Sequence, residues 1–371
     1  MSILKWATPR LTASVRTKRI TSAVRGWIGI DFGSHGLKLA QVERRGSEYR
    51  IAARWSLTHV GNAEAFGIES FSNAMPGQIS NLKGLKQLFS GRRCAAVFPM
   101  ALVEHRLLEI PRGSAGEQHR MAGEELAAEL GVEPDELAFD CWDGSLGEQS
   151  DADVARTLVN SVPKSLAQKL GDSLLNIGLE CQVLDGVPCA LARAVELNNV
   201  HAAEDAVLAV DLSYTLPVVV LVKSGRPLFA RTLRGAGLQS MMQALQTSLD
   251  LSSDECQQLL VRYGVTAIGQ QPTLATGRTM QIIARPLQDL LNEIKRTADY
   301  ISQNFRGSKP QRVCLFGGGA AIKNLPEHIS HKLDLPTTPW GLGGESPDPG
   351  DALFGLAAGL SAIAWEDHAC S

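Results

Sequence analysis

The sequence predicts an α/β protein with two lobes of like architecture. An apolar strand, a short polar tip and a second apolar strand occur twice, as "WIGIDFGSHGLKLAQV" (residues 27–42) and as "AVLAVDLSYTLPVVVLV" (residues 206–222). Asp31 and Asp211 take the same place, at the end of the first strand of each passage. The chain has 371 residues, 44% of them hydrophobic, which is enough for two cores. A repeated unit in each half indicates two similar lobes.

In the first half, strands come before helices. Residues 27–58 contain three strands, with "RRGSE" as the turn between the second and third, so they predict a β-meander. Helical periodicity follows in "EQHRMAGEELAAELG" from Glu117 and in "SLAQKLGDSLLNIGLE" from Ser165. The region from Arg92 to Pro163 mixes strands with a helix, and we interpret it as an α+β insertion on the first lobe.

In the second half, helices surround one further strand. We expect helices from Leu238 to Gly264 and from Gln281 to Asn304, then the strand "RVCLFGGG", the helical stretch "AAIKNLPEHISHKL" and an apolar helix after Asp351. The longest apolar runs, residues 216–222 and 353–365, are shorter than the roughly 20 residues that span a bilayer. They are therefore predicted to be core elements.

Charge excludes some classes of partner. The net charge of −3 and the pI near 6.3 give no attraction to nucleic acid, so no nucleic-acid partner is expected. Residues 1–25 differ, because they hold six basic and no acidic residues with apolar residues at roughly helical spacing. This is typical of an amphipathic segment on an anionic membrane surface, and equally of a disordered tail. No signal peptide is recognisable and the seven cysteines show no paired spacing, so we expect a cytoplasmic protein with reduced thiols.

The first tip has the residues that phosphate binding needs. Gly33 lets backbone N–H groups approach an anion, Ser34 adds a hydroxyl, and Lys38 supplies a positive charge. Asp31 is suited to hold a hydrated Mg²⁺, and Asp211 to do the same from the second passage. A tight turn with no ligand is the alternative for a single glycine-rich tip.

A third candidate element is the run Gly317, Gly318 and Gly319 between a strand and a helix, where a ligand can pack against bare backbone. It is neither the dinucleotide fingerprint GxGxxG nor the Walker pattern GxxxxGK[ST], so Rossmann and P-loop proteins are not favoured.

Taken in order, these three elements resemble the phosphate-1, phosphate-2 and adenosine motifs of the actin-like ATPase superfamily. Within it, the chain is most similar to the PilM family of type IV pilus assembly, which is related to FtsA. "LNEIKRTADYIS" (residues 291–302) and "DECQQLLVRYG" (residues 254–264) resemble PilM helices, and the likeness covers almost everything after Gly26. It implies the actin-like ATPase fold, with two RNase H-like lobes and an α+β insertion called subdomain 1C.

The resemblance also implies ligands and their residues. ATP would be bound with Mg²⁺, the ion being held through water by Asp31 and Asp211. Glu293 and Lys295, with Arg296, would contact the ribose or base. The complete nucleotide set would be Asp31, Gly33, Ser34, Lys38, Asp211, Ser213, Glu293, Lys295, Gly317, Gly318 and Gly319.

PilM proteins are scaffolds that hold the cytoplasmic tail of the bitopic membrane protein PilN in a groove between subdomains 1A and 1C. The resemblance therefore implies a PilN-like partner, a location at the inner face of the cytoplasmic membrane, and at most a slow ATPase; a homo-oligomer is compatible with it. The expected domains are a basic extension (1–25), subdomain 1A in two parts (26–91 and 164–205), the 1C insertion (92–163), the second lobe with subdomains 2A and 2B (206–345) and a C-terminal helix returning to 1A (346–371).

The second tip departs from the family. Ser213 stands where a glycine is usual, and Tyr214 and Pro217 replace small or hydroxyl residues, which would crowd the γ-phosphate or remove a backbone donor. Two alternatives stay open: a small-molecule kinase of the sugar or acetate type from the same superfamily, and a nucleotide-free platform scaffold of a type II secretion or pilus system.

Overall fold

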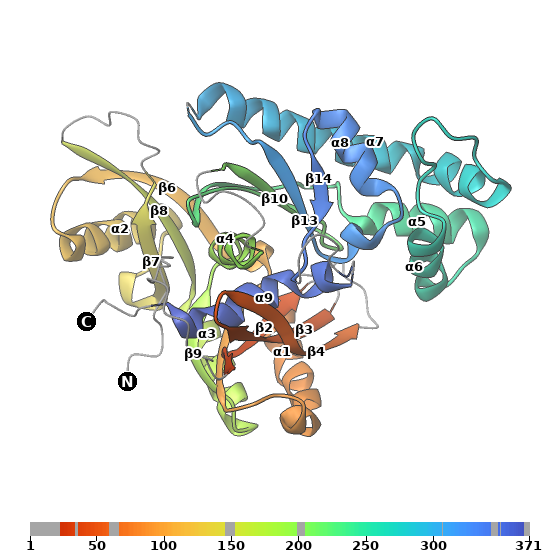
Figure 1. The fold of residues 1–371 in the computed structure, drawn as a ribbon. Helices are drawn as coiled ribbons and strands as arrows, with labels where there is room; N and C mark the ends of the chain where they lie inside the picture. Colours follow the sequence, from red (N-terminus) through yellow and green to blue (C-terminus); the bar gives the residue numbers. More distant parts are fainter. Residues whose placement is uncertain are drawn as a thin grey trace. The chain divides into compact units, whose positions relative to one another are not determined.

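The structure is a computed structural model, which describes residues 23–33, 36–58, 67–144, 153–198, 205–305, 307–342, 348 and 350–366. Its described residues fall into two compact units (Figure 1). Unit 1 lies within Met1–Gly46, Ala52–Ala190 and Leu360–Ser371, and unit 2 within Ser47–Ile51 and Leu191–Gly359. Two units of similar topology agree with the repeat seen in the sequence.

Unit 1 is built on a mixed sheet of order β1-β3-β2-β5-β9, with β4 also paired to β3. Neighbours β2 and β3 are antiparallel, whereas β5 runs parallel to β2 and β9 parallel to β5. The expected meander is therefore present. The strands are β1 (Val24–Arg25), β2 (Ile28–Gly33), β3 (Gly36–Arg45), β4 (Glu48–Thr58), β5 (Arg93–Val97) and β9 (Glu180–Asp185).

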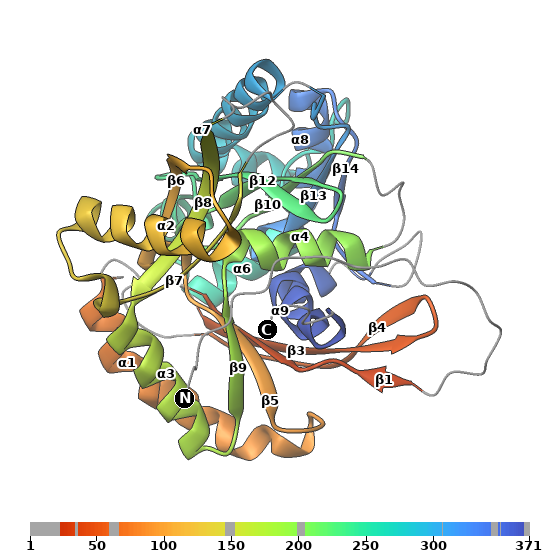
Figure 2. The same cartoon turned by 90° about the vertical axis from the view of Figure 1, so that its left-hand side faces the viewer.

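One face of this sheet is covered by helices that form the main core of unit 1 (Figure 2). Alternate residues Ile28, Ile30 and Phe32 of β2 are buried there, as the period-2 pattern of a strand requires. They share the core with Met75 of α1 and Leu170 of α3. The helical segments are α1 (Ile68–Ser80), η2 (Asn81–Gln87) and α3 (Lys164–Asn176).

A separate three-stranded antiparallel sheet of order β6-β8-β7 also belongs to unit 1. It consists of β6 (Glu104–Pro111), β7 (Leu137–Asp143) and β8 (Val154–Pro163), with η3 (Met100–Leu102), α2 (Ala115–Leu130) and η4 (Pro134–Glu136) beside them in sequence. Ser114 caps α2 by accepting from the Glu117 N–H, and α2 packs on Leu108 and Val159. The α+β insertion is thus present, but an insertion of 92–163 begins too early, because β5 pairs with β2 and β9 in the first sheet.

Hydrogen bonds tie Ser361, near the end of the described chain, to the first sheet. Ser361, which is buried, accepts from the Trp27 N–H through its carbonyl oxygen (3.1 Å), donates its hydroxyl to the Trp27 carbonyl (2.6 Å) and accepts from the Val42 N–H (2.9 Å). A Cβ on Gly26 would lie 2.3 Å from the Ser361 carbonyl oxygen. Glycine is therefore required where β1 passes into β2.

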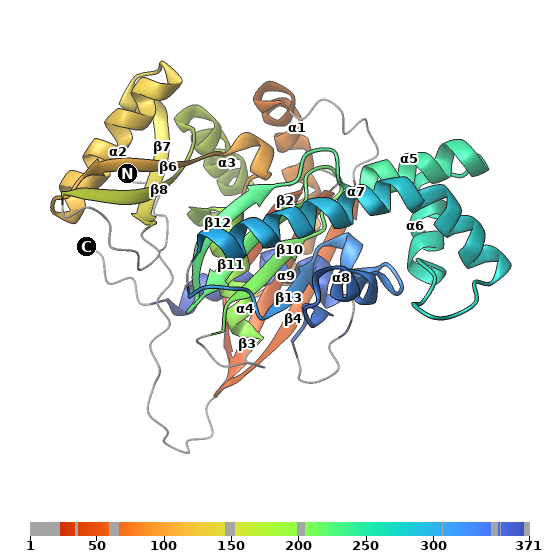
Figure 3. The ribbon, with the colours of Figure 1, turned by 90° about the horizontal axis from the view of Figure 1, so that it is seen from above.

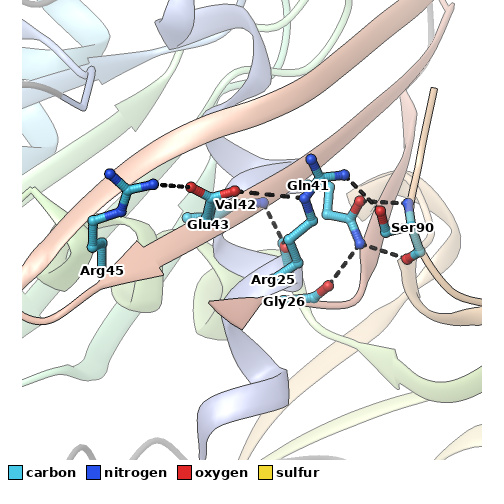
Figure 4. Close-up of polar contacts among 8 residues, drawn as sticks. Arg25, Gly26, Gln41, Val42, Glu43, Arg45 and Ser90 are labelled. Atoms are coloured by element: carbon cyan, nitrogen blue, oxygen red, sulfur yellow. Dashed lines mark hydrogen bonds and ion pairs between the residues drawn. The ribbon is translucent and has the colours of Figure 1, made fainter. Parts of the chain in front are cut away.

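A second polar network joins β1 to the loop before β5 (Figure 4). The buried Gln41 amide donates to the carbonyls of Gly26 and Ser90 and accepts from the Ser90 N–H, each at 2.8 Å. Arg25 donates to the Ser90 hydroxyl (2.6 Å) and pairs with Glu43 (3.6 Å). These contacts hold the start of the described chain against the loop at Ser90.

Unit 2 repeats the arrangement, with a mixed sheet of order β12-β11-β10-β13-β14. Its β10–β11–β12 meander is antiparallel, and β13 and β14 follow in parallel, as β5 and β9 do in unit 1. The apolar run 216–222 supplies β11, whose residues Val218–Val222 are buried as expected. The strands are β10 (Val207–Asp211), β11 (Val218–Lys223), β12 (Arg226–Thr232), β13 (Arg312–Phe316) and β14 (Thr337–Pro339).

The long helix α7 (Leu274–Asn304) dominates the helical part of unit 2 (Figure 3). It begins seven residues before the expected Gln281, because Thr273 caps it by accepting from the Thr276 N–H (3.1 Å). The other helical segments are α5 (Leu238–Leu249), α6 (Ser253–Arg262), η5 (Gly318–Ala321), α8 (Leu325–Leu333) and η6 (Asp351–Phe354). Helices α4 (Val187–Leu197) and α9 (Gly355–Ser361) each begin in one unit and end in the other, and η7 (Ala362–Trp365) follows α9 in unit 1.

Within the described residues, none of the helices combines the length and apolarity needed to cross a bilayer. The six described cysteines are free. Residues 1–22 of the basic extension lie outside the described residues.

Candidate functional site

In unit 1, the first tip brings Asp31 and Lys38 together. The two residues are directly paired across β2 and β3, so their side chains leave the same face of the sheet. Lys38 Nζ lies 2.8 Å from Asp31 Oδ2, and both side chains are largely buried, with 20% and 7% of their surface exposed. This is a shielded ion pair at the end of a strand.

Glycine makes room for this lysine. A Cβ on Gly33 would lie 3.2 Å from Lys38 Nζ and 3.0 Å from the Gly36 carbonyl oxygen, both closer than ordinary contact. A Cβ on Gly36 would lie 2.3 Å from the Leu57 carbonyl oxygen. The two glycines therefore permit the close pairing of Gly33 with Gly36 at the end of β2 and β3; Ser34 and His35 fall outside the described residues.

A third charged residue that the sequence analysis missed, Asp185, lies in the same row. Asp31 pairs in register with Val97 of β5, and Val97 pairs with Asp185 at the end of β9. Asp185 is buried, and its Oδ1 accepts from the Gly186 N–H at 2.8 Å. The run "VLD" carries the same signal as "GID" at Asp31, an acid directly after buried strand residues, but no glycine-rich tip follows it to draw attention.

In unit 2, Asp211 and the triple glycine meet at the ends of adjacent strands. Asp211 of β10 pairs in register with Phe316 of β13, and Gly317 follows with a positive φ of 78°. A Cβ on Gly317 would lie 2.3 Å from Asp211 Oδ1, so any other residue would displace the carboxylate. The Gly319 N–H donates to the Leu212 carbonyl at 3.1 Å, which seats the glycine turn on the end of β10.

The second tip folds onto the start of α5. The Ser213 and Tyr214 carbonyls accept from the N–H groups of Leu238 (3.4 Å) and Gln239 (2.9 Å), and the Ser213 hydroxyl donates to the Leu216 carbonyl (2.7 Å). Val218 pairs with Asp211 in register, in the position that Lys38 has beside Asp31. The two tips are therefore alike in topology and different in charge.

The candidate nucleoside residues on α7 are engaged in ion pairs. Glu293 pairs with Arg231 of β12 (3.0 Å) and with Arg296 (2.8 Å), while Lys295 pairs with Asp299 (3.0 Å). Arg231 also donates to the Thr297 hydroxyl at 3.0 Å. In the described part of the chain, no ion pair joins Glu293 or Lys295 to the Gly317 turn. Their ion pairs connect α7 to β12 and join residues within α7.

Polar side chains gather on the face of the three-stranded sheet that α2 leaves free. His105, Asn160 and Asp140 pair in register across β6, β8 and β7, and His105 Nδ1 lies 2.5 Å from Asn160 Oδ1. A Cβ on Gly186 would clash with the Asn160 amide, so this sheet approaches the end of β9. Two buried donors, Asn160 Nδ2 and Trp142 Nε1, lack an acceptor among the described residues.

Burial sets the ionisation of this polar row. Desolvation lowers the pKa of His105, more strongly than the hydrogen bond with Asn160 raises it, so its imidazole is neutral near pH 7. Desolvation, followed by the charge of Asp185, raises the pKa of Asp140 to about 7, against the hydrogen bond from the Cys141 N–H. Desolvation thus favours the uncharged form of both side chains.

Comparison with solved structures identifies the fold. The chain is similar to PilM in a PilM–PilN type IV pilus biogenesis complex, with a TM-score of 0.70 and 18% sequence identity over 92% of this chain and 99% of that one. It is also similar to the ethanolamine utilization protein EutJ from Carboxydothermus hydrogenoformans, with a TM-score of 0.51 and 12% identity over 92% and 91% of the two chains. No protein-family model matches the sequence. The chain has the actin-like ATPase fold, as its three motifs predicted.

Proposed function

We propose that this protein is an actin-like, ATP-binding scaffold of the type IV pilus assembly platform, which binds the cytoplasmic tail of a PilN-like membrane protein. The observation that carries the proposal is the similarity to PilM over nearly the full length of both chains. The proposed location is the inner face of the cytoplasmic membrane, where the partner and residues 1–25 would hold the protein.

Two groups of residues, which we call half-sites, have the chemistry that a magnesium nucleotide requires. They are Asp31 with Lys38 in unit 1, and Asp211 with the Gly317 turn in unit 2. Lys38 would pair with phosphate oxygens, helped by the backbone at Gly33 and by Ser34, and the bare Gly317 turn would lie against the nucleoside, as in the family. Magnesium takes most of its ligands from water and phosphate, so the two carboxylates Asp31 and Asp211 are sufficient. When bound, the ion would neutralise phosphate charge. Ser213 would join only by releasing the Leu216 carbonyl, and Glu293 and Lys295 only by exchanging their ion pairs.

Calorimetric titration with Mg-ATP tests the nucleotide site. We expect the Asp31→Asn variant to bind at least tenfold more weakly than the unaltered chain, because it loses a carboxylate at the phosphate end and the partner that positions Lys38. The matched control is Asp172→Asn, an exposed aspartate on α3 of the same unit. Unaltered affinity in Asp31→Asn would place the nucleotide elsewhere, and absence of binding by the unaltered chain would favour the nucleotide-free scaffold.

Asp185 keeps the kinase alternative open. It provides a buried carboxylate in the row of Asp31, and a small-molecule kinase needs such a group to take the proton of a substrate hydroxyl. The two functions separate in one assay of phosphate release from ATP. A scaffold shows slow turnover that sugars and acetate leave unchanged, whereas a kinase consumes ATP only with its substrate.

The proposed peptide groove lies between the three-stranded sheet and the first sheet. The unpaired donors Asn160 Nδ2 and Trp142 Nε1 support it, since carbonyl oxygens of an extended peptide would satisfy both. Leu107, 53% exposed and in register with Leu158 between β6 and β8, adds an apolar contact on the same face.

Fluorescence polarisation of a labelled N-terminal peptide from the cognate PilN-like protein tests this groove. Trp142→Phe keeps the ring and removes its N–H, so we expect binding about five- to twentyfold weaker, the range for one lost buried hydrogen bond. Trp55→Phe on β4 is the control. Equal loss in both variants, or in neither, would contradict a role for the Trp142 donor.

A further inference from the structure

One end of unit 1 has a cavity that the proposed function does not use. It measures about 380 Å³ and lies where β5 begins, lined by Ile28, Leu39, Leu82, Leu85, Phe89 and Leu179. The exposed Gly91 and Arg92 also line it, so the cavity lies directly beneath the surface. An apolar space of this size is more than twice the roughly 150 Å³ that holds a benzene molecule in a protein core.

The surface around the cavity is basic. Residues 70–103 contain four basic residues and no acidic one. Lys83 and Arg93 are exposed, and no carboxylate pairs with either in the described part of the chain. Arg92 is exposed and pairs with Glu180 at 3.3 Å. The segment that lines the cavity therefore carries an excess of positive charge, in a chain whose net charge is −3.

Three aliphatic side chains are exposed beside these charges. Leu88, between two lining residues, is 50% exposed, and Val24 and Leu175 are 47% and 57% exposed. Hydrogen bonds place the latter two at the same end of the unit: Arg25 next to Val24 donates to Ser90, and Arg92 donates to the carbonyl of Gly178, whose own N–H donates to Leu175. We call Val24, Leu88, Leu175, Lys83, Arg92 and Arg93 the η2 patch.

The start of the described chain lies against this patch. Arg25 and Gln41 both bond Ser90, two residues before Arg92 (Figure 4). β1 therefore delivers the end of the basic segment 1–25 next to the loop that borders the cavity. In Figure 2, η2 and the loop into β5 lie at the end of the first sheet where β5 begins.

We propose that the η2 patch is a membrane-contacting surface, which binds anionic phospholipid. Lys83, Arg92 and Arg93 would lie among the negatively charged headgroups, and the exposed aliphatic side chains would enter the boundary with the acyl chains. The cavity, which Phe89 lines next to Leu88, provides an apolar space beneath this contact. Lys83 and Arg93, which pair with no carboxylate in the described part of the chain, lie with exposed aliphatic side chains and match an anionic bilayer in both charge and polarity. The inference does not depend on the pilus function.

Flotation of the full chain with lipid vesicles tests the charges. Vesicles of phosphatidylcholine are compared with vesicles of equal parts phosphatidylcholine and phosphatidylglycerol. Neutralising two cations as Lys83→Gln with Arg93→Gln should weaken binding to the anionic vesicles about tenfold or more, because each basic residue near such a surface contributes strongly. The control, Arg106→Gln with Arg120→Gln, removes two exposed charges from β6 and α2 of the same unit and should change binding less than about twofold.

A second pair of variants tests the apolar contact. Leu88→Ser should weaken vesicle binding several-fold, whereas Ile268→Ser, at an aliphatic residue of unit 2 that is 47% exposed, should leave it unchanged. Thermal melting of each variant confirms folding. Equal loss in both charge variants would show attraction by net charge alone, and no loss in either would assign vesicle binding to residues 1–25; either result overturns the proposal.

Discussion

At the scale of single residues, three glycines lie where another residue approaches too closely to leave space for a side chain. Gly26 faces Ser361, Gly36 faces Leu57 and Gly317 faces Asp211, each within 2.3 Å of where a Cβ would be. Two of these three lie at the strand ends that carry the candidate nucleotide residues. Their role is to leave space for the approaching residue, and a polar or charged side chain could not do this.

Gly26→Ala is therefore expected to destabilise the fold. The added methyl group would push against the Ser361 carbonyl and disturb the three hydrogen bonds that the Ser361 carbonyl and hydroxyl make with Trp27 and Val42, at a cost of about 3 kcal/mol. Gly77→Ala in α1 is the matched control, since its Cβ would meet no atom within 4 Å. Alanine in the helix should raise the free energy of unfolding by about 0.5–1 kcal/mol. Urea unfolding followed by circular dichroism measures both. A Gly26→Ala protein as stable as the unaltered chain would refute the packing argument.

At the scale of elements, the three-stranded sheet has a row of polar side chains on one face and a small apolar core on the other. α2 covers the apolar face, where Leu108, Ile110 and Val159 form a small core. The opposite face has Asp140 in register with Asn160 and His105. The burial that neutralises Asp140 makes the stability of this sheet depend on pH.

Asp140→Asn should alter that pH dependence. The folded carboxyl has a pKa of about 7 against 3.8 without the fold, so between these values the folded state binds the proton and the unfolded state does not. Stability is then lost as the pH rises toward 7, by at most about 4 kcal/mol for a shift of this size. The Asp140→Asn variant has no such loss. We therefore expect its unfolding free energy, relative to that of the unaltered chain, to be higher at about pH 8 than at about pH 5. Equal pH profiles of the unfolding free energy would contradict the buried carboxyl.

The ion pairs of α7 show that the packing of secondary-structure elements determines which partner a charged residue meets. The motif "LNEIKRTADYIS" indicates ribose contacts by its resemblance, whereas the folded helix directs Glu293 to Arg231 of β12 and Lys295 to Asp299. Sequence spacing places a residue on a helix face, but the neighbouring strand determines which partner it meets. The same charges therefore stabilise the packing of α7 in the described structure.

At the scale of the whole molecule, both units use one plan. An antiparallel meander is followed by two parallel strands, with Asp31 and Asp211 at corresponding positions beside β5 and β13. Two half-sites of this kind differ mainly in the residue across the hairpin, Lys38 in one and Val218 in the other. Unit 1 therefore has a lysine beside its strand-end aspartate, whereas unit 2 has a valine in that position and the Gly317 turn at the end of the neighbouring strand.

The sequence by itself determined the two meanders, the Asp31 and Asp211 strand ends, the glycine turn and the actin-like fold class. The meanders and strand ends depend on alternation and turn residues, which act between residues close together in the chain, whereas the actin-like fold class was implied by the resemblance of the three motifs to that superfamily. Tertiary structure alone decided that β5 joins the first sheet, that Asp185 lies in the row of Asp31, and that Ser361 bonds to Trp27. Each of these contacts joins residues more than sixty positions apart, where strand pairing and burial of the whole unit, and no local pattern, determine which groups meet.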